Sequence, residues 1–339
     1  MRFIALCPVA CEDACVRELE SLSCSSFERG LGFVSFSSDD IWRVLRFAQT
    51  VSHVLLEAGR DGALSDDAAR TFSAEPSFRV SALTGSRDEE RRVGAVLFES
   101  FGVPVDLKDP AVEVGLVEDR LGFVLSGFDY SLREYKVYKT PRSLNPCVAA
   151  SILWGLDVEP GVLCDPLSHD GVLPIEFALR SFGISPRRFQ ERTFASRFAS
   201  RFTDSKWVRE QSDAQILALE QNANYLRRAE HNARLAGVAD MITFSRYDLE
   251  WIDMRVGERE VDSCVLELPH RSSKLDGSSY DRLIAEVGVA ARHMLAGDGR
   301  LIVVTNDPLV SFDGFTLSSR MVVPRGELAL YALAFGRVR

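Results

Sequence analysis

Four acidic residues follow apolar runs in the second half of the chain, and they are its best candidates for chemistry. Asp165, Glu220, Asp248 and Glu267 each come directly after, or just past, a stretch that is typical of a buried strand. The carboxyl ends of parallel strands meet at one edge of a sheet, where ligands bind. Glu220 could accept hydrogen bonds from two ribose hydroxyls, and Asp248 from an exocyclic amine such as that of adenine. Alone, each would be a solvated cap; together they predict a site for a nucleoside-containing ligand.

The first of these acids ends a predicted strand–loop–helix unit. The apolar run 162–165 breaks at Pro166 and a small polar loop, and residues 172–180 then repeat apolar side chains at helical spacing. The amino terminus of such a helix offers unpaired N–H groups to an anion or to ribose oxygens. Gly171 is the only glycine in the loop, so the unit lacks the dinucleotide-binding glycine pattern. An ordinary strand-to-helix turn fits the local pattern equally well.

The elements around this unit predict an α/β fold. Strands alternate with helices, which indicates a mostly parallel sheet with right-handed crossovers, and two final strands indicate an antiparallel C-terminal hairpin. The predicted strands are 162–165, 216–220, 242–245, 261–266, 300–304, 315–322 and 328–334, and the predicted helices are 145–156, 172–180, 222–235 and 280–295.

The first half of the chain predicts an α+β arrangement with its own boundaries. We expect an N-terminal α+β domain over 1–62, a second unit over 63–128 that begins with a polar connector at 66–74, and a linker over 129–144. The remaining residues, 145–339, would form the α/β domain.

Composition and charge limit the classes of protein to which the chain can belong. The net charge of −9 means that any contact with nucleic acid must come from a local basic patch. No apolar run approaches the roughly 20 residues of a membrane span, and residues 3–10 are too short for a secretion signal. Seven cysteines over a long chain suggest no disulfide framework. Cys7, Cys11, Cys15 and Cys24 cluster without a zinc-ribbon spacing, so we expect packing rather than metal. A cytoplasmic protein without a membrane partner is the expectation.

Two stretches are locally basic. In 130–145, Arg133, Lys136, Lys139 and Arg142 alternate with tyrosines, a pattern that suits single-stranded RNA or a solvated hinge. In 187–209, Arg197 and Arg201 border a predicted helical stripe of phenylalanines. Such a stripe usually packs against the core and leaves its arginines in solvent; the alternative is an RNA-binding face.

These motifs resemble a known family. Residues 145–339 resemble the Rossmann-like, S-adenosylmethionine-dependent RNA guanine-N2 methyltransferases, and residues up to 126 resemble the ferredoxin-like and THUMP domains that precede that catalytic half. The residues that carry the first resemblance are Ser143-Leu144-Asn145-Pro146, Asp165-Pro166 with Gly171, Ile175-Glu176, and Asn232-Ala233 with Ala236-Gly237. Phe98-Glu99 and the stretch from Asp106 to Val114 look like THUMP.

The resemblance implies an S-adenosylmethionine site. Asp165, Pro166, Ser168, His169 and Gly171 would shape its methionine end, with the two acids Glu220 and Asp248 at the ribose and the adenine. In relatives this loop is glycine-rich, whereas here it reads Ser168-His169-Asp170-Gly171. A histidine at positive φ would cost on the order of 1 kcal/mol. Its side chain would also fill space where the ligand should lie.

The resemblance also implies a catalytic motif. Relatives carry Asn/Asp-Pro-Pro-Tyr after the fourth strand, where this chain has Glu267, Leu268, Pro269 and His270. In that motif an oxygen accepts hydrogens of the guanine amine while a ring stacks on the extruded base.

Two functions follow from these implications. The chain would methylate the exocyclic N2 of a guanine in tRNA, with a small activating subunit as a candidate partner. Alternatively, it is a relative that has lost catalysis, does not bind the cofactor and holds RNA or a protein partner.

Overall fold

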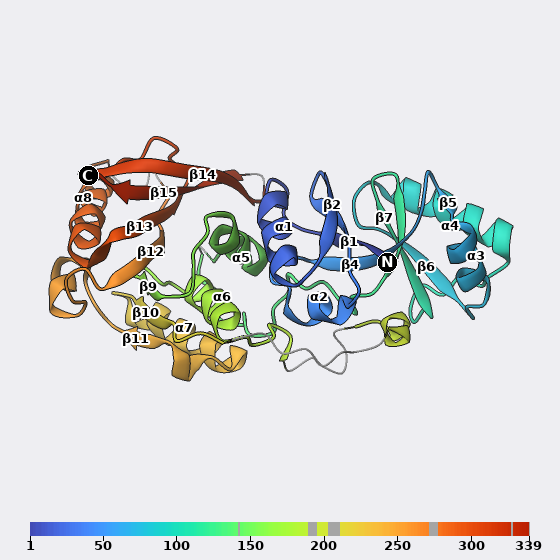
Figure 1. The fold of residues 1–339 in the computed structure, drawn as a ribbon, viewed down its shortest axis with the longest axis horizontal. Helices are drawn as coiled ribbons and strands as arrows, with labels where there is room; N and C mark the ends of the chain where they lie inside the picture. Colours follow the sequence, from blue (N-terminus) through green and yellow to red (C-terminus); the bar gives the residue numbers. More distant parts are fainter. Residues whose placement is uncertain (142, 189–194, 203–210, 271–276, 327, 339) are drawn as a thin grey trace.

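The computed structural model describes residues 1–339 except 142, 189–194, 203–210, 271–276, 327 and 339. The chain is elongated, and its two β-sheets lie one after the other along the long axis (Figure 1). The first sheet uses residues before 125 and the second uses residues after 161, so the order of the sheets follows the order of the sequence.

The second sheet has the predicted α/β architecture. Its strand order is β11 (Thr243–Ser245), β10 (Gln215–Leu219), β9 (Val162–Asp165), β12 (Val261–Glu267), β13 (Leu295–Thr305), β15 (Leu328–Arg337) and β14 (Phe315–Arg325). Pairing is parallel from β11 to β13 and antiparallel from β13 to β14. The mostly parallel sheet and its C-terminal hairpin are therefore confirmed.

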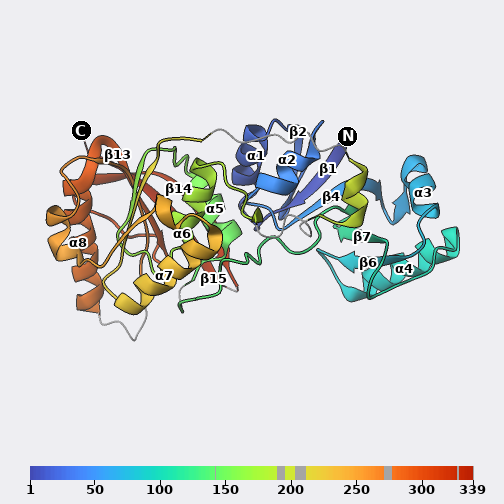
Figure 2. The same ribbon diagram turned by 90° about the horizontal axis from the view of Figure 1, so that it is seen from below.

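Alternation along the strands explains how both faces of this sheet are covered. Ile302 and Val304 of β13 pack in the same core as α5 (Pro146–Gly155), α6 (Val172–Ser181) and α7 (Ala223–Ala236). Leu301 and Val303 face the other way and pack with α8 (Gly277–Met294). Successive side chains of a strand point to opposite faces, so the sheet is sandwiched between helices (Figure 2).

The first sheet joins the two units predicted for the N-terminal half. Its order is β2 (Ser25–Gly30), β3 (Phe33–Ser37), β1 (Arg2–Leu6), β4 (His53–Arg60), β8 (Arg120–Val124), β7 (Val112–Val117) and β6 (Phe78–Ala82), with β5 (Ala63–Leu64) beside β4. Its helices are α1 (Glu12–Ser21), α2 (Ile41–Phe47), α3 (Asp66–Ser73) and α4 (Arg87–Phe101). Pairing of β4 with β8 makes the sheet continuous across residue 62, so a domain boundary there stays a prediction.

The prediction of a polar connector at 66–74 was wrong, because these residues form α3. The Ser65 hydroxyl accepts a hydrogen bond from the Ala68 N–H and caps the helix. Phe72 is fully buried in the first core. One apolar residue in each helical turn was too weak a pattern to show the helix in the sequence.

A buried polar network connects the two halves. Glu176 of α6 is fully buried; its Oε1 accepts hydrogen bonds from Arg133 Nε at 3.1 Å and from the Tyr135 hydroxyl at 2.7 Å. Its Oε2 accepts one from Gln49 Nε2 at 2.7 Å. Glu18 of α1 in turn accepts from the backbone N–H groups of Gln49 and Thr50. The network fixes α6 against the N-terminal half.

This network corrects one predicted RNA contact. Arg133 is buried, donates to backbone carbonyls as well as to Glu176, and cannot reach a phosphate from this position. A guanidinium among tyrosines suits an RNA surface and a buried ion pair equally, and its partner lies 43 residues away.

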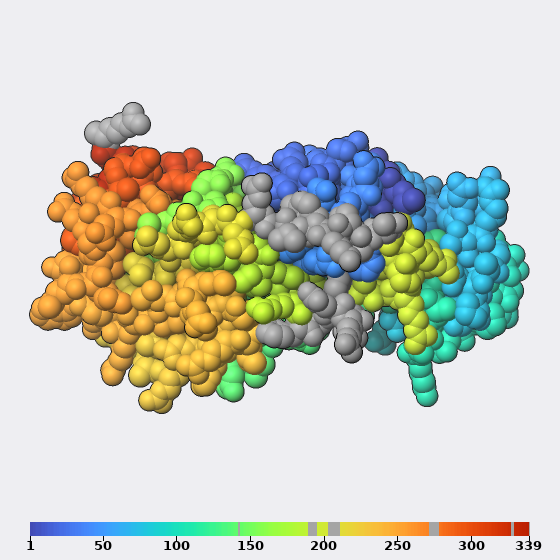
Figure 3. Space-filling model, turned by 60° about the horizontal axis from the view of Figure 1, so that its bottom comes forward, coloured from blue at the N-terminus to red at the C-terminus, as the bar shows by residue number. Residues whose placement is uncertain are grey.

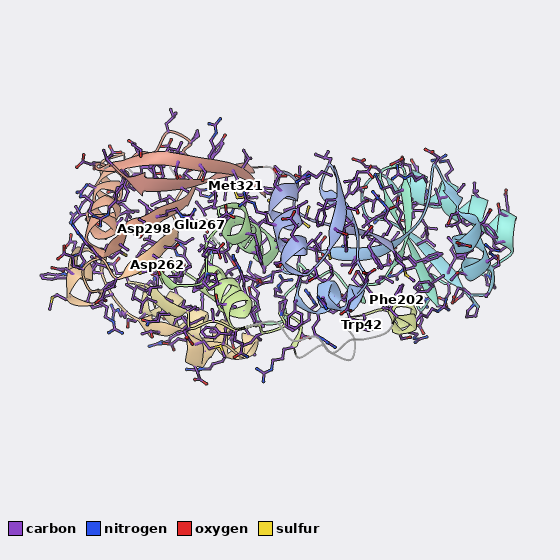
Figure 4. The ribbon with its side chains drawn as sticks, viewed as in Figure 1. Trp42, Phe202, Asp262, Glu267, Asp298 and Met321 are labelled. Carbon is purple, nitrogen blue, oxygen red and sulfur yellow. The ribbon has the colours of Figure 1, made fainter. Side chains whose placement is uncertain are left out.

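The segment that holds Arg197 and Arg201 lies against the first sheet (Figure 3). Its described part is a short 3₁₀ helix, η2 (Arg197–Arg201), in which Phe198 is buried beside Phe123. Arg197 pairs with Asp109, and Arg201 pairs with Glu75. Trp42 Nε1 donates to the Phe202 carbonyl at 2.9 Å (Figure 4). The phenylalanine stripe therefore faces the core where it is described; the rest of it lies outside the described residues.

All seven cysteines are buried and unbridged. Within the described ranges, no group of three or more metal-binding side chains occurs, and no helix is long and apolar enough to cross a membrane.

The buried network yields a stability prediction. Arg133→Met would leave the Glu176 carboxylate buried without its cation, so the free energy of unfolding should fall by about 3–5 kcal/mol. Arg133→Met with Glu176→Gln should recover part of that loss. As a control, Arg17→Met removes an exposed pair with Asp157, also between the halves, and should cost at most about 1 kcal/mol. Urea denaturation measures all three; equal losses for the Arg133 and Arg17 variants would contradict the assignment.

Candidate active site

The carboxyl edge of the second sheet brings the predicted acids together. Asp165 and Glu267 end the neighbouring strands β9 and β12, and both line one small cavity with Ser168 and His169. Glu220 follows β10 and is buried beside His169. Asp248 lies near the same edge but is only half-buried. In Figure 4, Glu267 lies on the side of the sheet nearer the N-terminal half, and Asp262, at the other end of β12, lies further out.

His169 occupies the centre of this edge. Its backbone has a positive φ of +50°. The backbone N–H donates to Glu220 Oε2 at 3.0 Å, ring atom Nδ1 lies 3.5 Å from the same oxygen, and Nε2 lies 3.4 Å from the Glu267 carbonyl oxygen. The remaining cavity is about 10 Å³, which is room for about one water molecule. His169 therefore fills the hollow between Glu220 and Glu267.

Gly171 starts the helix that follows this loop. It caps α6 with φ +81°, in the left-handed region that favours glycine. A Cβ on this residue would lie 3.0 Å from Ala229 Cβ and 3.2 Å from Ala229 Cα. Close packing of α6 on α7 therefore requires glycine here. Pro166 is buried in the same turn.

Burial beside other carboxylates raises the pKa of Asp165 and burial raises that of Asp170. Burial raises the pKa of Asp165 well above its ordinary value, and the nearby Glu220, Glu267 and Asp170 carboxylates raise it further. The Leu167 N–H, which donates to Asp165 Oδ1 at 3.1 Å, acts in the opposite direction. Burial also raises the pKa of Asp170. Asp165 therefore holds a proton to higher pH than an exposed aspartate does.

Glu267 has a partner that the sequence did not reveal. Arg325, at the end of β14, places Nη1 2.5 Å from Glu267 Oε1 and 3.1 Å from His270 Nε2. Leu268 is fully buried, and its N–H donates to the Val304 carbonyl, so it continues the strand. Pro269 and His270 are half-buried. Arg325 is separated from Glu267 by 58 residues, and no motif signals it.

Asp248 and the predicted RNA-binding lysines are less buried than the other acids of this edge. Asp248 caps the 3₁₀ helix η4 (Leu249–Met254), and its Oδ2 accepts from Gln221 Nε2 at 2.5 Å. Lys139 is exposed, and Lys136 is half-buried, with its Nζ donating to the Leu144 carbonyl. Burial lowers the pKa of Lys136 to about 8. Arg142 lies outside the described residues.

Comparison with known proteins identifies the fold at this edge. Residues 133–314, more than half of the chain, match the family described as "RMKL-like, methyltransferase domain". The chain belongs to this family. The match includes the edge with Asp165, Glu220, Asp248 and Glu267, and also the buried pair of Arg133 with Glu176.

Individual similar proteins cover different shares of the chain. A Methanocaldococcus jannaschii protein named tRNA (guanine(6)-N2)-methyltransferase is 29% identical over 216 residues, or 60% of this chain and 56% of that protein. The chain thus covers about half the length of this curated relative. The crystal structure of TrmN from Thermus thermophilus matches with a TM-score of 0.70 and 22% identity over 99% of each chain. The structure of SMU.472 complexed with SAH matches with a TM-score of 0.71 and 17% identity over 100% and 98%. Both structural likenesses show the fold.

The acids suit the cofactor that the fold suggests, but the room between them does not accommodate it while His169 is in place. The Glu220 carboxylate accepts one hydrogen bond on each oxygen, from the His169 and Asn222 N–H groups, and each oxygen can accept another from a hydroxyl donor. Small-molecule sites usually measure about 300–1,000 Å³, against the 10 Å³ found here. The cavity beside His169 is therefore too small for S-adenosylmethionine with the His169 side chain in this position.

The raised pKa of Asp165 makes stability depend on pH. Folded Asp165 keeps its proton above the ordinary pKa of about 4, whereas unfolded Asp165 loses it, so this residue destabilises the fold progressively as pH rises. Asp165→Asn keeps the acceptor for the Leu167 N–H without the charge. Relative to wild type, the variant should gain unfolding free energy at about pH 8, and the gain should shrink at about pH 4. Urea denaturation at both values tests this; a gain that does not change with pH would contradict it.

Proposed function

We propose that this protein is an S-adenosylmethionine-dependent methyltransferase that modifies the exocyclic N2 of a guanine in tRNA. The observation that carries the proposal is the meeting of buried Glu220 and Glu267 at one sheet edge, on either side of His169. Membership of a methyltransferase family supports it, as does the name of the M. jannaschii relative.

The residues at the edge would divide the binding of the cofactor among them. With His169 turned away, Glu220 would bind the ribose hydroxyls through both carboxylate oxygens. Asp248 would accept a hydrogen bond from the adenine amine, and Asp165, Ser168 and the turn at Gly171 would contact the methionine end. When bound, S-adenosylmethionine supplies an electrophilic methyl group.

The stretch after β12 would orient the base. Glu267 would accept hydrogens of the guanine amine, which directs the nitrogen lone pair toward the methyl group and gives the released proton an acceptor. His270 would lie against the base as a flat ring, and Pro269 would hold the turn. Leu268 anchors the stretch through its hydrogen bond to β13. Arg325 would position Glu267 through their ion pair.

The filled cavity favours a second candidate, a homologue without catalysis that binds RNA or a partner protein. His169 in the hollow and Arg325 on Glu267 are the observations that support it. For the methyltransferase tRNA would be the partner, and for either candidate the cytoplasm would be the place of action; an activating subunit stays a prediction.

Methyl transfer to RNA separates the two candidates. Unmodified tRNA transcripts and S-adenosylmethionine with a tritiated methyl group should give labelled tRNA with the wild-type protein. Glu220→Ala should lower kcat/KM by about 10- to 100-fold, since hydrogen bonds to a charged group contribute about 1.5–3 kcal/mol. Asp298→Ala, an exposed acid of β13, should leave it unchanged. Tight tRNA binding without any transfer would favour the second candidate.

A further inference from the structure

A cavity of about 540 Å³ lies where the two halves of the chain meet. Its walls come from the ends of β1 and β4 in the first sheet, from Asp129, Ser131 and residues between 143 and 148, and from residues 324–326 at the end of β14. In Figure 1 the hairpin and α5 lie beside α1 of the N-terminal half. The contact is close, since a Cβ on Gly155 of α5 would meet Met321 Sδ of β14 at 2.8 Å and Ala14 Cβ of α1 at 3.3 Å.

This interface cavity adjoins the small cavity that holds His169. The two share Leu144 as a wall. Arg325 lines the interface cavity and contacts Glu267, which lines the small one. A methyl acceptor must reach Glu267, and the interface cavity offers room beside Arg325, which contacts both Glu267 and His270.

The lining of the interface cavity suits a purine. Polar side chains, among them Ser52, His53, Asp129 and Asn145, can form hydrogen bonds with the edge of a base. Leu6, Leu83 and Val148 with two prolines supply apolar surface for its faces. The volume falls within the range usual for small-molecule sites, about 300–1,000 Å³.

Positive charge lies beside the interface cavity. A neighbouring cavity of about 420 Å³ shares Ser131, Ser143 and Asn145 with the interface cavity. Lys136 and Lys139 line it, and Lys139 is exposed. Cations beside a base-sized cavity match the backbone phosphates of a nucleotide.

We propose that the interface cavity binds one purine nucleotide extruded from the RNA, with its base beside Arg325 and its phosphate toward Lys139. The proposal rests on the proposed function and assigns it the substrate pocket. The first sheet would then shape the pocket directly, through Leu6 of β1 and His53 of β4. Enzymes that modify a base inside a duplex must take it out of the stack, so a pocket of this kind is required.

Photo-cross-linking tests the position of the base without requiring catalysis. tRNA transcribed with 6-thioguanosine is irradiated with the wild-type protein, and the linked peptides are identified by mass spectrometry. We expect links to peptides that contain Leu6 or His53. Ser131→Trp should fill the cavity and lose most of these links. As a control, Arg92→Trp in the separate cavity of about 380 Å³ should keep them.

The outcomes are distinct. Links that avoid these peptides in the wild type, or that persist in a folded Ser131→Trp variant, overturn the pocket. Methyl transfer by the same wild-type preparation reports separately on the proposed function. Methyl transfer without links in the cavity refutes only the proposal that the interface cavity binds the base. Links in the cavity without methyl transfer support that proposal and refute the proposed methyltransferase activity.

Discussion

Buried carboxylates at one sheet edge are the constraint on which the rest of this structure depends. The parallel strands β9, β10 and β12 deliver Asp165, Glu220 and Glu267 to the same place, and like charges there repel one another and lose hydration. Three features reduce this repulsion and the cost of lost hydration. Asp165 holds its proton to higher pH, Glu220 accepts hydrogen bonds from two backbone N–H groups, and Glu267 forms an ion pair with Arg325. His169 lies between Glu220 and Glu267 and leaves room for about one water molecule beside it. A ligand that enters must replace these interactions with its own donors.

The position of the N-terminal half follows from a second buried charge. Glu176 of α6 contacts Arg133, Tyr135 and Gln49. These contacts fix the first sheet beside the carboxyl edge of the second sheet. Because a buried ion pair tolerates little displacement, the two halves should keep one relative placement. That placement forms the interface cavity, whose walls come from both halves. Two residues that the sequence predicted to bind RNA therefore have different roles. Arg133 forms a buried ion pair between the two halves, whereas Lys139 is exposed beside the interface cavity.

The sequence predicted what depends on local pattern and missed what depends on distant partners. The alternation of strands and helices fixed the second sheet, and the acids after its strands marked the edge. The positive φ of His169 lies in the loop that is glycine-rich in relatives, but from the sequence alone only its cost could be stated. Arg325 could not be foreseen, because its ion pair depends on where the end of β14 lies after the C-terminal hairpin has joined the sheet beside β13. Helix α3 was missed because Phe72 alone provides most of its apolar face. Ion pairs and turn geometry between distant segments leave no periodic signal in a sequence.

The central claim is that His169 occupies an S-adenosylmethionine site whose other parts remain in place. Isothermal titration calorimetry of the wild type and of His169→Gly with S-adenosylmethionine tests it most directly. Glycine tolerates φ +50° without strain and leaves the hollow open. The account predicts that His169→Gly binds at least about tenfold more tightly than the wild type, a difference of about 1.4 kcal/mol, and that adding Glu220→Ala removes the gain. Equal affinities, or no binding by His169→Gly, would contradict the claim.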